Sequence, residues 1–243
     1  MSAPRIYLAP EDGEGHRLKL PQAQAHHLNR VLRLREGASL ILFDGLGNEA
    51  TARIVEIQGK TVLVDIDAWR AVSRESSLNI TLYQGIGRGQ RMDYAIQKAV
   101  ELGVSGIIPL MSERTVVQLD SKKTAARMEH WRAVMIGACE QCGRNHLPTL
   151  AEPVGISSIS QLPQGATGVV LAPEAESSLA GISPPTDIHL VIGPEGGLTA
   201  TEIAHCVARG FAKTRFGPRI LRTETAGPAV LASVQTLWGD LGK

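Results

Sequence analysis

Residues 188–203 read IHLVIGPEGGLTATEI, and this stretch decides the fold class of the chain. The apolar run at 188–192 is typical of a short strand buried in a parallel sheet. Thr199 is followed three residues later by Glu202, which is the spacing of the capping box that begins an α-helix. Because a buried strand leads directly into a capped helix, the stretch predicts one unit of an α/β domain.

The same alternation continues on both sides of this stretch. Short apolar runs predict further strands, and amphipathic segments predict the helices between them. We expect strands at residues 78–84, 106–111, 168–172, 188–192 and 213–216, and helices at 91–103, within 121–142, at 199–209 and at 223–238. This part of the chain therefore predicts an α/β domain with a mostly parallel sheet.

The N-terminal part follows a strand period instead. Residues 39–44 and 49–57 flank a glycine-containing turn and predict a hairpin, and residues 61–68 predict a third strand. This small all-β unit ends near Val72 and is followed by a polar linker. We expect two domains, at residues 1–72 and 73–243.

One helix is predicted in the all-β unit, at residues 22–34. Arg30 and Arg33 lie off its apolar stripe and face water or a ligand; the stripe consists of Ala25, Leu28, Val31 and Leu32. The same region contains one of two basic runs in a chain whose net charge is only +1. The runs lie between Glu14 and Glu36 and between Glu202 and Glu224, and contain no acidic residue. They suggest local contacts with anions, although a solvated surface is the ordinary alternative.

Composition excludes several classes of protein. Among 243 residues, 43% are hydrophobic and 20% are charged, which is typical of a globular chain and not of a disordered one. No apolar run approaches the ~18 residues of a membrane-spanning helix. The N-terminus lacks the apolar core of a secretory signal, so we expect a cytoplasmic protein. Cys139, Cys142 and Cys206 offer neither a disulfide framework nor four zinc ligands, so we expect no metal.

Two loops at predicted strand ends carry the chemistry. Residues 192–199, IGPEGGLT, follow one strand, and residues 216–227, FGPRILRTETAG, follow another and enter the last helix. Ligands of open α/β sheets bind beyond the carboxyl ends of the strands. Glycines let the backbone lie against a flat ligand, and a helix start offers free N–H groups. We expect these two bends to meet and form one ligand slot.

Other loop motifs are weaker. The chain contains neither a phosphate-binding P-loop nor the nucleophile elbow of hydrolases, and GIGRGQ (85–90) has the wrong spacing for a dinucleotide fingerprint. A nucleotide-dependent enzyme using GIGRGQ and a non-catalytic RNA-binding module remain the alternatives to an enzyme built on the two loops.

Six motifs, in order, carry a family resemblance. They are HHLNRVLRLREG (26–37), GRGQRMDYAIQKAVELGV (87–104), SERTVVQL (112–119), ACEQCGR (138–144), IGPEGGLTATEI (192–203) and GPRILRTETA (217–226). Over nearly its whole length the chain resembles the RsmE-type 16S rRNA (uracil-N3) methyltransferases of the SPOUT superfamily. It departs from the family pattern at Arg88, at Cys142 and at Gly227-Pro228; we expect the proline to be tolerated in a first helical turn.

The resemblance implies a PUA-like β-barrel domain that binds RNA, followed by a SPOUT-type α/β methyltransferase domain with a trefoil-knotted parallel sheet. It implies S-adenosyl-L-methionine (SAM) as cofactor and a homodimer as the assembly. It further implies methylation of N3 of one uridine, U1498 in the usual numbering, of the 16S rRNA in the small ribosomal subunit.

The resemblance also implies roles for individual residues. The cofactor would lie against Leu171, Pro173, Ile192, Gly193, Pro194, Glu195, Gly196, Gly197, Phe216, Gly217, Ile220, Leu221, Arg222, Thr223 and Ala226. The cation beside the uracil would be Arg222, with Arg114 or Arg144 as second candidates, and the proton acceptor would be Glu224 or Glu101. Glu195 is more suited to a scaffold role, and the alternative for Glu101 is a surface acid paired with Lys98 or with a partner chain. RNA would be held by Arg5, His26, Arg30, Arg33, Arg88, Arg91, Lys98, Arg132 and Arg144, of which Arg91 and Arg132 could be ordinary surface charges.

Overall fold

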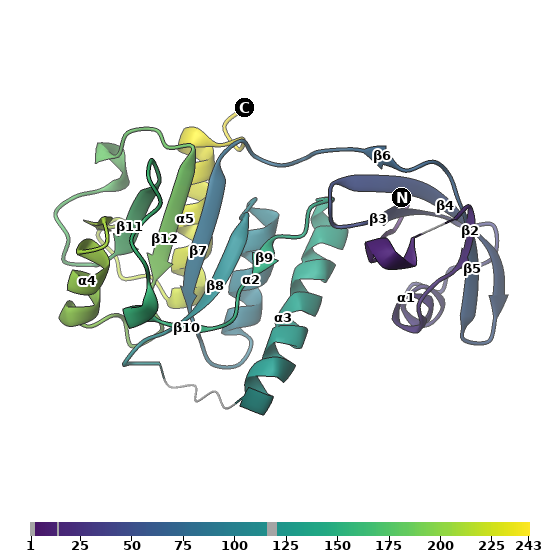
Figure 1. Ribbon diagram of the computed structural model, residues 1–243, viewed down its shortest axis with the longest axis horizontal. Helices are drawn as coiled ribbons and strands as arrows, with labels where there is room; N and C mark the ends of the chain where they lie inside the picture. Colours follow the sequence, from purple (N-terminus) through teal and green to yellow (C-terminus); the bar gives the residue numbers. More distant parts are fainter. Residues whose placement is uncertain (1–2, 14, 116–120) are drawn as a thin grey trace. The chain divides into compact units, whose positions relative to one another are not determined.

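The computed structural model describes residues 3–13, 15–115 and 121–243, which form two compact units (Figure 1). The first unit contains the described residues up to Glu75, together with the segment 136–147. The second unit contains residues 76–135 and 148–243 as far as they are described. Within these residues, no helix is long and apolar enough to span a membrane.

The first unit is built on a mixed sheet. Its strands are β1 (Arg5–Tyr7), β2 (Arg17–Lys19), β3 (Ser39–Phe43), β4 (Asn48–Gln58), β5 (Thr61–Ile66) and β6 (Arg70–Ala71). The hydrogen-bonded order is β1-β3-β4-β5-β2, and β6 pairs with β4. β1 runs parallel to β3, and the other pairs are antiparallel. The predicted hairpin at 39–44 and 49–57 is confirmed as β3 and β4, and the third strand as β5.

Alternate residues of these strands fill the core of the first unit. Ala50, Ala52 and Ile54 of β4 and Val62 and Val64 of β5 are almost completely buried. Each fully buried aliphatic side chain stabilises the fold by about 1.5–3 kcal/mol relative to exposure. The period of two therefore selects the face of the sheet on which the core forms.

The helix of the first unit is shorter than predicted. α1 covers Gln22–His26 and continues as a π-helix over His27–Val31; a separate 3-10 helix covers Pro10–Asp12. Arg33 has a positive φ of 52°, which ends the helical path before the predicted boundary at residue 34. Leu32 is 38% exposed, because the wider π turn rotates it away from Leu28 and the core. Its assignment to the apolar stripe is wrong, and the side chain of Val31 lies outside the described residues.

The segment 136–147 packs within the first unit although it is distant in sequence. The backbone N–H of Tyr7 donates a hydrogen bond of 3.0 Å to Oε1 of Glu140. His146 forms bridges with Gly45 and Leu46, in the turn between β3 and β4. A Cβ at Gly47 would overlap the His146 ring, so this glycine is required for the close approach.

The second unit is a parallel α/β sheet. Its strands are β7 (Asn79–Gly85), β8 (Gly106–Met111), β9 (Thr149–Leu150), β10 (Val154–Gly155), β11 (Thr167–Leu171), β12 (Asp187–Ile192) and β13 (Phe211–Thr214). The order is β10-β8-β7-β12-β11-β13, with β9 paired to β8, and every pairing is parallel. The predicted α/β domain with a parallel sheet is confirmed.

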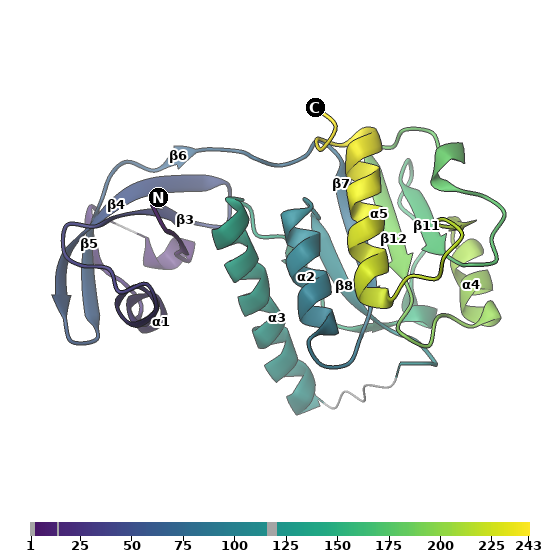
Figure 2. The same cartoon turned by 180° about the vertical axis from the view of Figure 1, so that it is seen from behind.

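The helices of the second unit cover this sheet. They are α2 (Arg91–Glu101), the N-terminal part of α3 (Ser121–Cys142), α4 (Ala200–Val207) and α5 (Thr223–Trp238), with 3-10 helices at Ile156–Ser158 and Leu179–Gly181. α2 and α5 lie side by side on one face of the sheet, nearer the viewer in Figure 2. The predicted capping box begins α4, because the Thr199 hydroxyl and the Glu202 carboxylate each accept a hydrogen bond from the other residue's backbone N–H.

Two local predictions in this unit are wrong. The strand predicted at 213–216 is β13, Phe211–Thr214, so Phe216 lies beyond its end. The strand begins two residues earlier than predicted because it includes Phe211, whose side chain is 2% exposed and packs into the core. Pro228 lies inside α5, beyond its first turn, so its missing N–H deprives the Glu224 carbonyl of its usual helical donor.

Candidate active site

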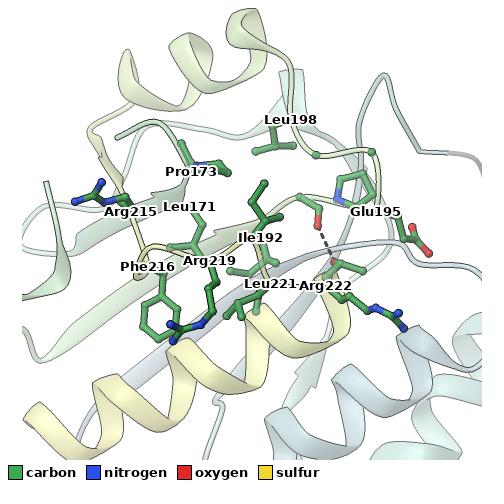
Figure 3. Close-up of a pocket in the computed structure, with 18 of the residues that line it drawn as sticks. Leu171, Pro173, Ile192, Glu195, Leu198, Arg215, Phe216, Arg219, Leu221 and Arg222 are labelled. Carbon is green, nitrogen blue, oxygen red and sulfur yellow. Dashed lines mark hydrogen bonds between the residues drawn. The ribbon is translucent and has the colours of Figure 1, made fainter. Parts of the chain in front are cut away.

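A pocket of about 710 Å³ opens where three loops of the second unit meet (Figure 3). The loops are residues 171–174 after β11, 192–198 between β12 and α4, and 215–224 between β13 and α5. Since β12, β11 and β13 are parallel neighbours, their carboxyl ends lie at the same edge of the sheet. The prediction that the two glycine-rich bends meet at one edge is confirmed.

The residues predicted to hold a cofactor are brought together in this pocket. It is lined by Leu171, Pro173, Ile192, Gly193, Pro194, Glu195, Gly196, Gly197, Phe216, Gly217, Ile220, Leu221, Arg222, Thr223 and Ala226. Arg114 and Glu224, predicted for the chemistry, line it too. Leu198, Pro218 and Arg219 lie within the two loops predicted to form the ligand slot, and Ala172 lies between Leu171 and Pro173. Sequence reasoning missed Glu174, Ile203 and Arg215, and it assigned Arg91 only to RNA. Their nearness to the glycine motifs was the available signal for most of them.

The glycines of the 192–198 loop are required by close packing. A Cβ at Gly196 would lie 2.8 Å from Cβ of Arg114. Gly197 has a positive φ of 71°, which side chains rarely allow. At the end of β7, a Cβ at Gly85 would overlap the backbone nitrogen of Pro194. The loop can therefore take this path only with glycine at these positions.

A buried relay joins the two bends. The hydroxyl of Thr223, the first residue of α5, donates a hydrogen bond of 2.7 Å to the carbonyl of Gly193 (Figure 3, dashed line). The same oxygen accepts a hydrogen bond of 2.9 Å from Nε2 of Gln84 at the end of β7. Thr223 and Gln84 are 6% and 1% exposed, so water does not compete for these bonds. The relay fixes the distance between the two sides of the pocket.

Glu195 fastens the start of α2 to the same loop. Its Oε1 accepts hydrogen bonds from the backbone N–H of Arg88, at 2.9 Å, and from Nη1 of Arg91, at 2.7 Å. Burial alone would raise the pKa of Glu195, but the hydrogen bonds from Arg88 and Arg91 outweigh it and hold the pKa below its usual value. An ionised carboxylate with two donors suits the predicted scaffold role.

Glu224 has a different environment. Its side chain is 16% exposed, and its Oε1 lies 3.6 Å from Nε of Arg91. Its Oε2 is buried and has no hydrogen-bond partner among the described residues. A buried carboxylate oxygen without a donor is costly. Because Glu224 also lines the pocket, it is a carboxylate there with spare hydrogen-bonding capacity.

Arginines surround the opening of the pocket. Arg114 donates from Nη1 to the carbonyl of Gly196, at 3.0 Å. Figure 3 shows Arg215 and Arg219 at the Phe216 end and Arg222 at the Glu195 end. Arg222 is exposed and precedes the first residue of α5. Positive charge at both ends favours an anionic partner.

Comparisons with known proteins agree with this geometry. The RNA methyltransferase domain family matches residues 74–235, and the RNA methyltransferase PUA domain family matches residues 20–67. The ribosomal RNA small subunit methyltransferase E of Buchnera aphidicola (subspecies Schizaphis graminum) is 33% identical over 98% of both chains. The chain belongs to the ribosomal RNA small subunit methyltransferase E family. The family predicted from the six motifs is confirmed.

Solved structures place the chain in the same family. The methyltransferase E of Neisseria gonorrhoeae, solved bound to S-adenosyl methionine, has a TM-score of 0.91 and 39% identity over 99% of this chain and 100% of that one. A methyltransferase of Legionella pneumophila, solved with bound SAM, has a TM-score of 0.95 and 40% identity over the same shares. The predicted SPOUT-type methyltransferase fold with a PUA-like N-terminal domain is therefore confirmed.

Two arginines predicted to act at the site belong to structural pairs instead. Arg144 is 5% exposed and pairs with Glu75. Arg5 has an 11% exposed side chain, pairs with Glu49 at 3.0 Å and donates to Asn145. Because burial and carboxylate partners occupy both guanidinium groups, the prediction that they contact RNA is corrected, as is the role of Arg144 beside the uracil.

Glu101 is also not in the pocket. Both oxygens of its carboxylate accept hydrogen bonds from Nζ of Lys98, at 2.7 and 2.9 Å. Of the two roles predicted for Glu101, its geometry therefore agrees with that of a surface acid paired with Lys98. Of the remaining predicted RNA contacts, Lys98 is half-buried, and the exposed ones are His26, Arg30, Arg33, Arg88, Arg91 and Arg132. Residues 116–119 of the 112–119 motif lie outside the described residues.

The cysteines are free thiols in the structure. Burial raises the pKa of Cys139 to about 12, and the thiol donates to the His146 carbonyl at 3.7 Å. Across residues 3–13, 15–115 and 121–243, no cluster of three or more His, Cys, Asp or Glu side chains could hold a metal.

Proposed function

We propose that the chain binds SAM in the pocket between the 192–198 and 215–224 loops and transfers its methyl group to N3 of a uridine of 16S rRNA. The target is U1498 in the usual numbering, within the small ribosomal subunit. The observation that carries the proposal is the pocket itself, where every predicted cofactor residue lies at the carboxyl edge of the sheet. Relatives solved with this cofactor support it.

The residues present fit this cofactor. A volume of about 710 Å³ lies within the ~300–1,000 Å³ range typical of small-molecule sites. Leu171, Ile192 and Leu221 supply apolar walls for the adenosine, and Gly193 and Gly196 let the backbone lie against it without a side chain. When bound, SAM supplies a methyl group carried on a sulfonium centre.

The side chains of the pocket supply the rest of the chemistry. The N3 proton of uracil must leave for the new bond to form, and Glu224 accepts it once its side chain turns the partnerless Oε2 toward the substrate. Arg222 or Arg114 stabilises the negative charge that develops on the uracil oxygens. The Gln84–Thr223–Gly193 relay holds the two bends in register, so that the reactants are oriented before reaction.

Donor binding is the first test. In Gly196→Val the new side chain collides with Arg114, so we expect calorimetry to show loss of SAM binding. Gly181→Val is the matched control, because a Cβ there meets nothing within 4 Å and Gly181 is outside the pocket. ATP should not bind the wild-type protein. SAM binding by Gly196→Val as tight as that of wild type would overturn the pocket assignment.

Methyl transfer is the second test. Mass spectrometry of rRNA from a deletion strain should show loss of one methyl group on one uridine, and the restored gene should return it. Intact RNA binding without methyl transfer would favour a non-catalytic RNA-binding module. A modified position other than N3 of U1498 would refute the proposed target.

We also propose that the exposed cations hold the rRNA through its phosphates. Arg30 lies in the last turn of the first unit's helix and Arg33 two residues beyond its end, and both are exposed. Arg30→Ala with Arg33→Ala should weaken RNA binding and lower the slope of log affinity against log salt by up to about 2. Arg17→Ala is the control, because Arg17 is already paired with Asp65. Equal affinities at low salt would remove these residues from the interface.

The homodimer, the trefoil knot and the cytoplasmic location stay predictions. Sedimentation of the purified protein at several concentrations tests the dimer directly.

A further inference from the structure

A second hollow, of about 530 Å³, lies at the start of α2. We call it the α2 hollow; it is lined by Arg88, Gly89, Gln90, Arg91, Tyr94 and Glu224. Arg91 and Glu224 also line the cofactor pocket, so the two spaces adjoin at these two side chains. We propose that the α2 hollow receives the acceptor uracil, with Tyr94 stacking on the base. This inference rests on the proposed function.

Tyr94 is the first reason for this assignment. Its side chain is 48% exposed on α2, whereas Met92, Ala95 and Ile96 of the same helix are buried. The ring therefore adds little to the core, and it faces a hollow instead. A base must be drawn out of its stack before its N3 edge can react, and an exposed aromatic ring replaces the lost stacking.

The charges around the ring suit a nucleotide. Nζ of Lys98 lies 5.9 Å from the centre of the Tyr94 ring. The backbone N–H of Arg88 is held by Glu195, while the side chain of Arg88 is exposed. Gly89 has a positive φ of 58°, which fixes the turn between Arg88 and the helix. A phosphate beside the stacked base would therefore meet an arginine presented from a fixed turn.

Glu224 determines how a uracil bound in the α2 hollow is oriented. Its side chain borders both spaces; Oε1 lies 3.6 Å from Nε of Arg91, and Oε2 is buried without a hydrogen-bond partner among the described residues. A uracil on Tyr94 first gives its N3 proton to Glu224, whose carboxylate must turn Oε2 toward the hollow, and the in-plane electron pair left on N3 then faces the methyl group. In the reaction the N3–H electron pair forms the N3–C bond, the proton passes to Glu224, and the electron pair of the broken C–S bond stays on sulfur.

Arg91 keeps the two spaces in register. It binds Glu195 of the cofactor loop at 2.7 Å and faces Glu224 at 3.6 Å. The hydrogen bond to Glu195 raises the pKa of Arg91 above its ordinary value, and Glu224 adds to this. Arg91 is therefore a positioning residue that holds Glu224 beside the junction of the two spaces.

Steady-state kinetics test the stacking role. With unmethylated small ribosomal subunits as substrate, Tyr94→Ala should raise KM by about 5- to 150-fold, the effect of one lost base–aromatic stack. Tyr94→Phe should keep the wild-type KM, because the ring is retained. Gln97→Ala is the matched control, being an exposed α2 residue outside the hollow. SAM affinity, measured by calorimetry, should be unchanged in all three variants.

Photo-crosslinking gives a readout that needs no turnover. rRNA containing 4-thiouridine, assembled into subunits and irradiated with the protein without SAM, should crosslink to the peptide that contains Tyr94. If the wild type methylates normally while Tyr94→Ala keeps its KM and crosslinks map elsewhere, the hollow assignment is wrong and the proposed function stands. If the wild type transfers no methyl group while crosslinks map to Tyr94, the proposed function fails instead.

Discussion

Two carboxylates, one in each unit, differ in how many donors they have. In the first unit, Oε2 of Glu49 accepts hydrogen bonds from Arg5, Arg74 and Asn145, at 3.0, 3.1 and 3.2 Å. In the second unit, one oxygen of Glu224 faces Arg91 at 3.6 Å, and the other is buried without a partner among the described residues. Both side chains are largely buried, at 5% and 16% exposure.

The difference separates a structural carboxylate from the one that we propose to be reactive. Burial raises the pKa of Glu49, but its three donors outweigh burial and lower the pKa to about 2. A carboxylate held so firmly is a poor proton acceptor. Glu224 keeps one oxygen without a hydrogen-bond donor in a side chain that borders two hollows, and folded proteins tolerate the resulting cost in stability where chemistry requires it.

Removing the reactive carboxylate should have the largest effect. In Glu224→Gln the side chain keeps its shape but cannot accept the N3 proton, so we expect kcat to fall by about 10²- to 10⁴-fold. SAM affinity and thermal denaturation should match wild type. Methylation of small ribosomal subunits with radiolabelled SAM measures the loss.

Glu101→Gln is the control for this prediction, because Glu101 is fastened to Lys98 outside the pocket. It should methylate at the wild-type rate. If Glu101→Gln were inactive and Glu224→Gln active, the assignment of the two acids would have to be exchanged.

Removing the structural carboxylate should affect folding instead. Glu49→Gln leaves the largely buried Arg5 guanidinium without its counter-charge, and breaking such a pair costs about 3–5 kcal/mol of unfolding free energy. Urea denaturation followed by circular dichroism measures this change. Asp65→Asn is the control, since its pair with Arg17 is exposed to solvent, and it should denature like wild type. Wild-type stability of Glu49→Gln would contradict the comparison.

Protonation of the Glu49 carboxylate at low pH should destabilise the first unit. The pKa of Glu49 is about 2 in the folded protein and about 4.5 in the absence of its partners, so the unfolded chain binds the proton more tightly. Its contribution to stability is therefore complete above about pH 4.5 and is lost as the pH falls toward 2, by about 3 kcal/mol in all. Unfolding free energies measured across this range should decline less steeply in Glu49→Gln. Parallel curves for the two proteins would refute this linkage.

The comparison also shows what the sequence can predict. Strand periods, the Thr199 capping box and the glycines of 192–198 are local signals, and they located the sheet and the cofactor pocket. The partners of Arg5 and Arg144 could not be predicted, because Asn145 and Glu75 are brought to them only by the packing of the 136–147 segment. Most of that segment is the C-terminal part of α3, and nothing in its sequence indicates that it packs with the first unit.

Ion pairs between residues that are distant in sequence could not be predicted from the sequence either. Arg91 looks like a surface residue of α2, and only folding places it between Glu195 and Glu224. The sequence therefore identifies acidic residues that are candidates for catalysis. The number of hydrogen-bond donors around each carboxylate, which only the structure shows, then separates structural acids from those that we propose to be catalytic.

The side-chain amides of Gln84 and Gln235 offer a second comparison between a pocket residue and a structural one. We expect their substitution to have the smallest effect of those predicted. Nε2 of Gln84 donates to Thr223, in the relay beside the cofactor pocket. Nε2 of Gln235 donates to the carbonyl of Leu102, at 3.0 Å, and its Oε1 accepts from Ser76. Both glutamines are almost fully buried, at 1% and 0% exposure.

Gln84→Leu and Gln235→Leu should therefore both lower stability, since each leaves buried polar groups without a partner. Only Gln84→Leu should weaken SAM binding, by about 2- to 15-fold, because one hydrogen bond of the relay contributes about 0.5–1.5 kcal/mol. Calorimetric titration of both variants measures the difference. Thr223→Ser, which keeps the hydroxyl, should bind SAM like wild type. Equal weakening by the two leucine variants would mean that general loosening of the second unit, and not the relay, controls the width of the pocket.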